Sequence, residues 1–371
     1  MVSGGLGRRW NNALVHHQPR VLLVIADSSR TGGPEHVLTL ARELVAAGWE
    51  TAVACPDGEL RDRCSDVGIL SLGLATGASQ LALAPIRLRH LAHRYRADLI
   101  HSHALRAGSV VRRAQSGTPW VHTHHLDDWF TSSAWRVRAH RRELRQIGRG
   151  AGRQIAVSNS VFNFLTETVG CSQDRVRVVP NGIYPLLPRS RSQPAGATVG
   201  VLASLVASKG IDLALMALTM PAGRGLRLRV GGTGPELSTL LDLAEQLDVS
   251  ARVSFIGEVV DRQAFFDACD VVWVPSRREP FGLVACEALS SGVPVVGTRV
   301  GGLPDILEPP HYGVLVAPAN PAGLASVTAA LLADQERYRR LSEVGPERVR
   351  QRFSASRMAA LTRGVYRELL A

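Results

Sequence analysis

Residues 271–298 read V-V-W-V-P-S-R-R-E-P-F-G-L-V-A-C-E-A-L-S-S-G-V-P-V-V-G-T, and this stretch decides the fold. It opens with an apolar run, rich in β-branched residues, that predicts a buried strand ending at Pro275. A helix is expected to begin near Phe281 or Gly282 and to stop at Gly292. The run that follows predicts a second strand. A strand, a helix and a strand at this spacing indicate a β-α-β unit of a parallel sheet.

The same alternation recurs along the whole chain. The predicted strands span residues 21–26, 51–55, 99–101, 120–123, 154–157 and 176–179, then 198–203, 226–231, 252–256, 271–275 and 294–297. Helical patterns separate them. We therefore expect an α/β protein of two doubly wound, Rossmann-like domains facing a cleft, with ligands bound at the carboxyl ends of the strands.

A change in composition predicts where one domain ends and the next begins. Residues 186–197 are rich in Pro, Ser and Arg, which is typical of a linker. The expected organisation is a flexible leader at 1–19, an N-terminal acceptor-binding domain at 20–185, the linker, a C-terminal donor-binding domain at 198–353, and a helix at 354–371 that packs back on the N-terminal domain.

Composition narrows the class of protein. The 371 residues suit two domains, and 45% hydrophobic with 20% charged residues is typical of a globular chain. No stretch approaches the roughly 18 apolar residues of a transmembrane helix. The first twenty residues lack the apolar centre of a signal peptide. The five cysteines form no C-x-x-C pair, so reduced thiols are expected. A cytoplasmic protein of a GC-rich bacterium fits these features.

The charge balance points to an anionic partner. The net charge is +11, yet Lys209 is the only lysine in a chain that otherwise uses arginine. Retention of a compact ammonium at one position suggests a specific role for it. No nucleic-acid recognition motif is present, so phosphorylated small ligands are favoured over nucleic acid. A basic stretch at 136–149 is a candidate for peripheral contact with acidic lipid, the alternative being a solvated helix face.

The segment between the two strands carries the strongest chemical signal. Backbone amides of Gly282 and Leu283 at a helix start favour an anion. Glu279 precedes this start, and Glu287 lies about 7.5 Å further along the helix at 1.5 Å per residue. Two carboxylates at this spacing can accept hydrogen bonds from hydroxyls on either side of a bound diphosphate.

This segment resembles the E-x7-E motif of retaining glycosyltransferases with the GT-B architecture, in the large family numbered four. The resemblance implies that Glu279 faces the donor sugar and that Glu287 holds the nucleotide ribose. L-V-A-S-K-G resembles the family's L-x-x-x-K-G, whose lysine, here Lys209, touches the donor diphosphate. The family usually has arginine five residues earlier, where this chain has Ser204. Arg277 or Arg278 is a candidate to supply that charge.

Other segments extend the resemblance over most of the chain. T-G-G-P-E-H resembles the family's glycine loop, G-T-G-P-E a turn beside the nucleotide base, and I-A-V-S-N, V-V-P-N-G-I and G-G-L-P-D-I stand in their usual places. The implied donor-binding set is Gly32, Gly33, Lys209, Gly232, Glu279, Phe281, Gly282, Leu283 and Glu287, and the implied catalytic set is His125, Lys209 and Glu279.

Histidines mark the end of the strand near residue 120. Position matching favours His125 as the residue facing the donor sugar, with His124 as the near alternative. Asp127 and Asp128 follow on the expected acceptor side, where they suit an acceptor bearing amines. His122 joins His124 and His125, but no carboxylate-rich metal spacing accompanies them and no D-x-D is present. We expect no metal and no other cofactor.

The resemblance implies transfer of a sugar, with retention of configuration, from a nucleoside diphosphate-sugar to a small-molecule hydroxyl acceptor. UDP is the expected nucleotide from family frequency, and a role in secondary metabolism is expected. Alternatives are a membrane-surface glycosyltransferase acting on a lipid or polysaccharide, and a nucleotide-sugar epimerase or hydrolase on the same fold. A lectin-like role would leave both Glu279 and Lys209 idle.

Overall fold

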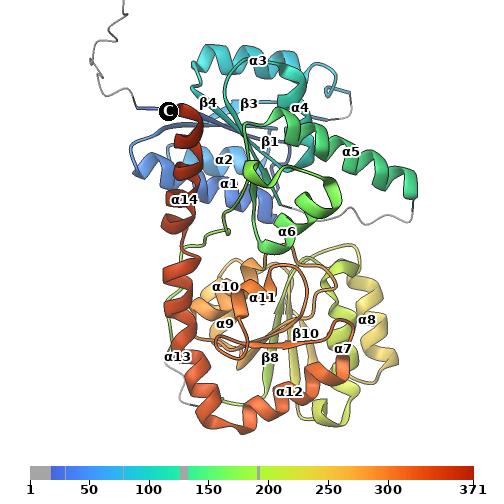
Figure 1. Ribbon diagram of the computed structural model, residues 1–371. Helices are drawn as coiled ribbons and strands as arrows, with labels where there is room; N and C mark the ends of the chain where they lie inside the picture. Colours follow the sequence, from blue (N-terminus) through green and yellow to red (C-terminus); the bar gives the residue numbers. More distant parts are fainter. Residues whose placement is uncertain (1–17, 30, 78, 126–132, 190–192) are drawn as a thin grey trace, which may run out of the picture.

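The computed structural model describes residues 18–29, 31–77, 79–125, 133–189 and 193–371. These residues form two α/β domains, one stacked on the other (Figure 1). The first 17 residues, which make up most of the expected leader at 1–19, lie outside the described residues, as do Asp127 and Asp128. The two Rossmann-like domains confirm the predicted fold class.

The N-terminal domain is built on a seven-stranded sheet with the order β3-β2-β1-β4-β5-β6-β7. All its strand pairs are parallel. The strands are β1 (Arg20–Ile25), β2 (Glu50–Cys55), β3 (Leu70–Gly73), β4 (Leu99–His103), β5 (Trp120–His124), β6 (Arg153–Ala156) and β7 (Val176–Val178).

The C-terminal domain repeats this plan in a six-stranded sheet with the order β10-β9-β8-β11-β12-β13. Its strand pairs are also parallel. The strands are β8 (Thr198–Leu202), β9 (Arg227–Gly231), β10 (Val253–Phe255), β11 (Val271–Val274), β12 (Val295–Thr298) and β13 (Val314–Val316). Strands β3 and β13 were not predicted, because each is a short edge strand without a continuous buried apolar run.

Helices connect the strands in both domains. In the N-terminal domain they are α1 (Gly32–Ala46), α2 (Glu59–Asp66), α3 (Ala84–Tyr95), α4 (Ala104–Ala114), α5 (Ala134–Gly150), α6 (Asn159–Asn163), the π-helix η1 (Phe164–Val169) and the 3₁₀ turn η2 (Gln173–Arg175). In the C-terminal part they are α7 (Ile211–Thr219), α8 (Leu237–Gln246), α9 (Arg262–Asp267), α10 (Leu283–Ser290), α11 (Leu303–Leu307), α12 (Pro321–Ala333), α13 (Gln335–Arg352) and α14 (Ala355–Leu370), with 3₁₀ turns η3 (Ala207–Lys209), η4 (Pro221–Gly223) and η5 (Ser250–Arg252).

Strand β1 shows why these strands are apolar throughout. Val21 and Leu23 pack with α1 and α14 on one face of the sheet, in one core cluster. Leu22 and Val24 pack with α3 and α4 on the other face, in a second cluster. Successive strand residues point to opposite faces, and helices cover both, so every position must be apolar.

The strand order reverses direction once in each sheet, between β1 and β4 and between β8 and β11. At such a switch point the loops leave the sheet in opposite directions, and a crevice opens at the carboxyl ends of the strands. The two sheets therefore each offer one preferred ligand position, and the loops that follow β1, β4, β8 and β11 line these positions.

The chain crosses between the domains twice, and the two crossings are bonded to each other. The amide of Ile183 donates to the Phe353 carbonyl at 2.9 Å, and the amide of Ala355 donates to the Ile183 carbonyl at 2.8 Å. Beyond the second crossing, α14 leaves α13 and lies on α1 of the N-terminal domain (Figure 1). Its Tyr366 is fully buried in the N-terminal core.

Length and composition of the helices bear on membrane insertion. None of the helices in the described residues combines the length and the apolar character needed to cross a bilayer.

Candidate active site

A lysine and a glutamate meet at the switch point of the C-terminal sheet. Lys209 ends the η3 turn after β8, and Glu279 lies in the loop after β11. Lys209 Nζ donates to Glu279 Oε2 at 2.8 Å, and Ser276 Oγ donates to the same oxygen at 3.0 Å. The two side chains are 26% and 13% exposed, so the pair is partly shielded but open on one side. This arrangement places one cation and one carboxylate where a ligand can reach both.

The backbone of Glu279 is held by a glycine turn that sequence analysis noted only for its place in the chain. The amide of Gly302 donates to the Glu279 carbonyl at 2.9 Å. Gly301 has φ of 54°, and a Cβ atom there would lie 1.8 Å from the Glu279 carbonyl oxygen. Only glycine allows this approach. The G-G-L-P-D-I segment therefore positions Glu279.

Helix α10 begins at Leu283, next to Glu279, with Gly282 as its N-cap at φ of 120°. No side chain caps this helix start, so its first amides are available to a ligand. Phe281, predicted to contact the donor, instead places its ring in the core, 5.9 Å from the Phe353 ring. Only the backbone of Phe281 is left to face a ligand.

Glu287 lies within α10, and it is paired with Arg262, a residue that was not among the predicted site residues. Arg262, the first residue of α9, donates from Nη1 to Glu287 Oε2 at 2.7 Å. Burial raises the pKa of Glu287, while Arg262 opposes the shift and Glu35 adds to it. The pairing leaves the second carboxylate oxygen of Glu287 without a bond to Arg262.

The glycine loop of the N-terminal domain faces α10. A Cβ atom on Gly32 would lie 3.5 Å from Leu283 Cδ1, so the starts of α1 and α10 approach each other across the domain boundary. The N-cap of α1, Thr31, makes no side-chain cap hydrogen bond either. Gly33 follows in the first turn of α1. Two uncapped helix N-termini beside one lysine form a region suited to an anion.

Two further contacts join the domains at this boundary. Ser158 Oγ donates to the carbonyl of Pro280, which follows Glu279, at 2.6 Å. The amide of Asn159 and its side-chain Nδ2 each donate to the Asp305 carboxylate at 2.9 Å. The I-A-V-S-N segment is thus hydrogen-bonded both to the loop that carries Glu279 and to the start of α11.

The arginine missing at position 204 is not replaced by Arg277. Ser204 is exposed. Arg277 makes a two-pronged pair with the Asp212 carboxylate at 2.7 and 2.6 Å and also donates to the Ala207 carbonyl. Arg278 has interactions of its own. Gly232, predicted to lie beside the nucleotide base, follows β9 and donates its amide to the Gly257 carbonyl at 2.7 Å.

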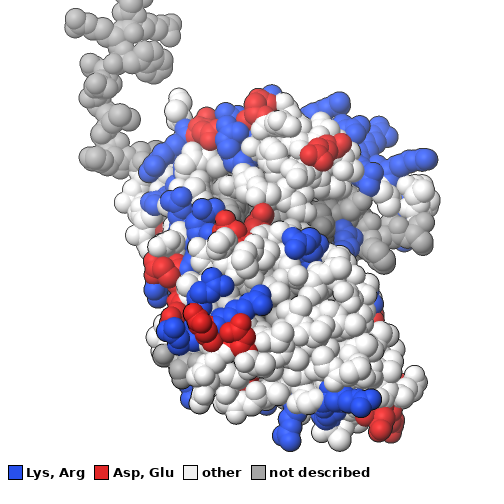
Figure 2. All heavy atoms as spheres, turned by 60° about the horizontal axis from the view of Figure 1, so that its bottom comes forward, with Lys and Arg blue, Asp and Glu red and all other residues white. Residues whose placement is uncertain are grey.

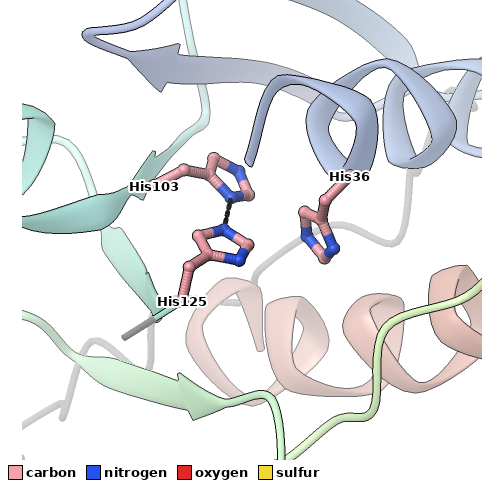
Figure 3. Close-up of side chains that lie close together, drawn as sticks. All are labelled: His36, His103 and His125. Atoms are coloured by element: carbon pink, nitrogen blue, oxygen red, sulfur yellow. Dashed lines mark hydrogen bonds between the residues drawn. The ribbon is translucent and has the colours of Figure 1, made fainter. Parts of the chain in front are cut away.

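Three histidines meet at the switch point of the N-terminal sheet, and Figure 3 shows them. His103 ends β4, His125 directly follows β5, and His36 lies in the first turns of α1. His103 Nδ1 and His125 Nε2 are 3.2 Å apart, and each histidine offers a nitrogen within 4.8 Å of the others. This trio differs from the one suggested by the sequence, His122, His124 and His125, and His36 was not among the predicted site residues.

The structure separates His124 from His125. His124 lies on the opposite face of β5 with His122, and its Nε2 lies 2.9 Å from Gln154 Oε1. Only 3% of His124 is exposed, and burial lowers its pKa to about 4. The alternation of strand residues therefore removes His124 from the interdomain side, whereas His125 remains there.

Burial also favours the neutral form of the three clustered histidines. It lowers the pKa of His36 to about 4, an effect that Asn181 partly opposes. It lowers the pKa of His103 and of His125 well below the ordinary range, and neighbouring imidazoles add to this shift. At neutral pH these rings therefore carry lone pairs and no charge.

A hollow of about 490 Å³ adjoins the glycine loop at the carboxyl ends of β1 and β2. Its acidic lining residues are Asp27, Asp57 and Glu59, and Arg106 from α4 lies on the same rim. Sequence analysis had sought the acceptor side near Asp127 and Asp128, which lie outside the described residues. The hollow is a separate polar surface beside the anion region.

The net charge of +11 does not form a continuous basic surface on the face shown in Figure 2. Basic and acidic side chains lie there in several mixed groups. The anion region is therefore a local feature, created by Lys209 and the two helix N-termini.

Both halves of the chain match family models. Residues 30–185 match the model described as Glycosyltransferase Family 4, and residues 189–348 match the model described as Glycosyl transferases group 1. Only residues 186–188 separate the two matches.

Relatives match over long stretches. The chain is 28% identical to a glycogen synthase of Mycobacterium tuberculosis, over 99% of this chain and 91% of that protein. It is 30% identical to a D-inositol 3-phosphate glycosyltransferase of Corynebacterium jeikeium, over 73% of this chain and 72% of that protein.

Solved structures share the fold. Anabaena Alr3699/HepE in complex with UDP-glucose superposes with a TM-score of 0.83 at 21% identity, covering 94% of this chain and all of that one. A sucrose-phosphate synthase from Thermosynechococcus elongatus gives a TM-score of 0.82 at 23% identity, covering 95% and 99%.

The contact between Gly301 and Glu279 yields the first prediction. In Gly301→Ala the new methyl group collides with the Glu279 carbonyl, so the free energy of unfolding should fall by about 1–3 kcal/mol. Urea denaturation measures this change. Gly364→Ala is the control, because a Cβ there meets nothing within 4 Å, and it should keep or slightly raise stability. Equal stability of the two variants would contradict the proposed constraint.

Proposed function

The chain belongs to the family 4 glycosyltransferases with the GT-B architecture, and we propose that it moves a sugar from a UDP-sugar to a hydroxyl acceptor, without a metal at the diphosphate. The observation that carries the proposal is the 2.8 Å contact between Lys209 and Glu279 beside the start of α10. Gly32, at the start of α1, faces this point from the other domain.

Donor binding is proposed for the C-terminal domain. The diphosphate is received by the amides at the start of α10, by those of Gly32 and Gly33, and by the Lys209 ammonium. Such donors are fixed before the reaction begins, so they stabilise the charge that develops on the leaving group without reorganising. The proposal of UDP is supported by the solved HepE complexes, whose ligands are UDP and UDP-glucose.

The two carboxylates of the E-x7-E segment are given different roles. When a diphosphate draws Lys209 away, Glu279 can accept hydrogen bonds from sugar hydroxyls. Glu287 keeps one oxygen on Arg262 and offers the other to the ribose hydroxyls. A carboxylate that accepts from ribose hydroxyls is a common solution in nucleotide sites.

The proposed reaction retains the configuration of the sugar. The bond from the anomeric carbon to the diphosphate oxygen breaks, and a bond to the acceptor oxygen forms on the same face. The acceptor's hydroxyl proton passes to the departing phosphate. His125 is proposed to face the sugar from the N-terminal domain, and because its pKa is lowered by burial it does so as a neutral imidazole.

The acceptor is proposed to bind the N-terminal domain in the hollow beside the glycine loop. The carboxylates of Asp27, Asp57 and Glu59 on its rim suit an acceptor with several hydroxyls or with amines. The names of relatives indicate different acceptors, since one is a glycogen synthase and another a D-inositol 3-phosphate glycosyltransferase. In this candidate function the acceptor is free in the cytoplasm.

A second candidate is an acceptor carried on a membrane surface. Trp135, near the start of the basic helix α5, is 68% exposed, and the Arg136 guanidinium lies 5.5 Å from its ring centre. An exposed tryptophan beside arginines suits the interface of an anionic bilayer.

Co-sedimentation with vesicles of anionic phospholipid separates the two acceptor candidates. Sedimentation of the wild-type chain that is lost in Trp135→Ala would favour the membrane acceptor, because the aromatic ring anchors the helix in the interface. The free acceptor predicts that wild-type and variant both stay in the supernatant. Exposed Tyr184→Ala is the matched aromatic control.

A thermal-shift comparison of UDP, GDP, ADP and dTDP tests the donor proposal. A ligand at about 100 times its Kd stabilises the native state by about 2.7 kcal/mol, so at equal concentrations the nucleotide with the lowest Kd raises Tm most. We expect that nucleotide to be UDP. In Glu287→Ala the UDP-induced shift should shrink, since the ribose contact is lost. Exposed Glu343→Ala should keep the full shift. A larger shift with another nucleotide would overturn the choice of UDP.

Removal of Lys209 tests leaving-group stabilisation. In Lys209→Ala, kcat for sugar transfer should fall by about 100-fold or more, because the ammonium acts on charge that develops in the transition state. Initial rates at saturating donor measure this effect. Arg339 is exposed on α13 and is not among the predicted site residues. Its replacement in Arg339→Ala should keep the wild-type kcat. A kcat close to the wild-type value in Lys209→Ala would contradict the proposed role of Lys209 in stabilising the leaving diphosphate.

A further inference from the structure

Three imidazoles from three separate elements converge at the carboxyl edge of the N-terminal sheet (Figure 3). They come from α1, from the end of β4 and from the residue after β5. We propose that His36, His103 and His125 form a binding site for one divalent transition-metal ion of the zinc, cobalt or nickel kind.

The spacing of the nitrogens fits such an ion. Two ligand nitrogens at about 2.0–2.1 Å from a tetrahedral zinc ion lie about 3.3 Å apart. His103 Nδ1 and His125 Nε2 are 3.2 Å apart. The third histidine lies opposite this pair on α1, with all three ligand atoms within 4.8 Å of one another. His36 therefore needs to approach by at most about 1.5 Å, which a side-chain rotation can supply.

His103 Nδ1 and His125 Nε2 share a hydrogen bond that an ion would replace, whereas other nitrogens of the cluster have no partner in the part of the chain that the structure describes. Within the described residues, neither ring nitrogen of His36 has a hydrogen-bond partner, although the ring is only 4% exposed, and Asn181 lies close by. His103 is fully buried, and its Nε2 also lacks a partner there. A buried imidazole without partners loses free energy that coordination to an ion would restore.

The donor set selects the class of ion. The cluster supplies nitrogen from three imidazoles and contains no carboxylate. Magnesium and calcium require oxygen ligands, whereas zinc, cobalt and nickel bind imidazole well. Three protein ligands leave a tetrahedral ion one coordination position for water or for an oxygen of a bound molecule.

Occupation of this site has a consequence for the transferase, and this part rests on the proposed function. An ion that takes the lone pair of His125 withdraws that nitrogen from the donor sugar. The bound ion therefore inhibits sugar transfer, and a chelator restores it. The three imidazoles are different residues from Lys209, Gly32 and Gly33, which are proposed to receive the diphosphate.

Metal binding is tested without any sugar nucleotide. Tag-free, chelator-treated protein is titrated with Co²⁺ in the visible range, and then with Zn²⁺ by calorimetry. We expect about one ion per chain, with the intense d–d bands of a four-coordinate cobalt centre. In His36→Asn and in His103→Asn, affinity should fall by at least tenfold, since loss of an outer-shell partner alone costs about 10–100-fold. Exposed His90→Ala should bind like the wild type.

The outcomes are decisive in both directions. Circular dichroism and thermal unfolding of the metal-free variants establish that they are folded. X-ray absorption of the zinc-loaded wild type counts the imidazole ligands directly, so the test does not depend on any variant. Three imidazole ligands support the site. The proposal would be overturned if the wild type bound no ion, if fewer than three imidazoles were counted, or if His36→Asn and His103→Asn bound the ion as tightly as the wild type does. These outcomes do not depend on the activity with UDP-sugars.

Discussion

The carboxyl edges of two parallel sheets face each other, and every feature of the site depends on this placement. The two domains are joined here by short polar contacts, from Ser158 to the carbonyl of Pro280 and from Asn159 to the Asp305 carboxylate. The starts of α1 and α10 approach each other at the same boundary, at Gly32 and Leu283. If the two helix N-termini lay apart, an anion would meet the amides of only one of them.

The C-terminal helix α14 contacts the strands of the N-terminal sheet through a buried hydrogen bond. The Tyr366 hydroxyl, on α14, lies 2.6 Å from His101 Nδ1, while His101 Nε2 lies 2.7 Å from Thr123 Oγ1. His101 thus connects α14 to β5, and its ring lies 4.1 Å from that of His103. Helix α14, which begins at the crossing between the two domains, therefore supports the strands that present His103 and His125. Buried hydrogen bonds of this kind are costly to leave unpaired, so they fix the arrangement.

The two carboxylates of the E-x7-E segment are each held by a cation, and the consequences differ. Glu279 is paired with Lys209, a flexible ammonium that a phosphate group can draw away. Glu287 is paired with Arg262, whose planar guanidinium contacts one carboxylate oxygen. Both carboxylates are largely shielded from water, so loss of either cation would leave a carboxylate without its counter-charge and would lower stability. The first pair is suited to exchange and the second to holding.

The sequence by itself determined the two Rossmann-like domains and most of their strands, because these depend on local patterns: apolar runs, glycines at helix ends, and the regular alternation of strands and helices. It also singled out Lys209, as the only lysine. Only the tertiary structure decided which residues meet across the chain. Arg262 reaches Glu287, and Gly301 allows the approach to Glu279, through contacts that no local pattern encodes. His36, His103 and His125 lie on three elements, and they converge only because strand order and strand alternation bring one face of β4 and β5 against α1.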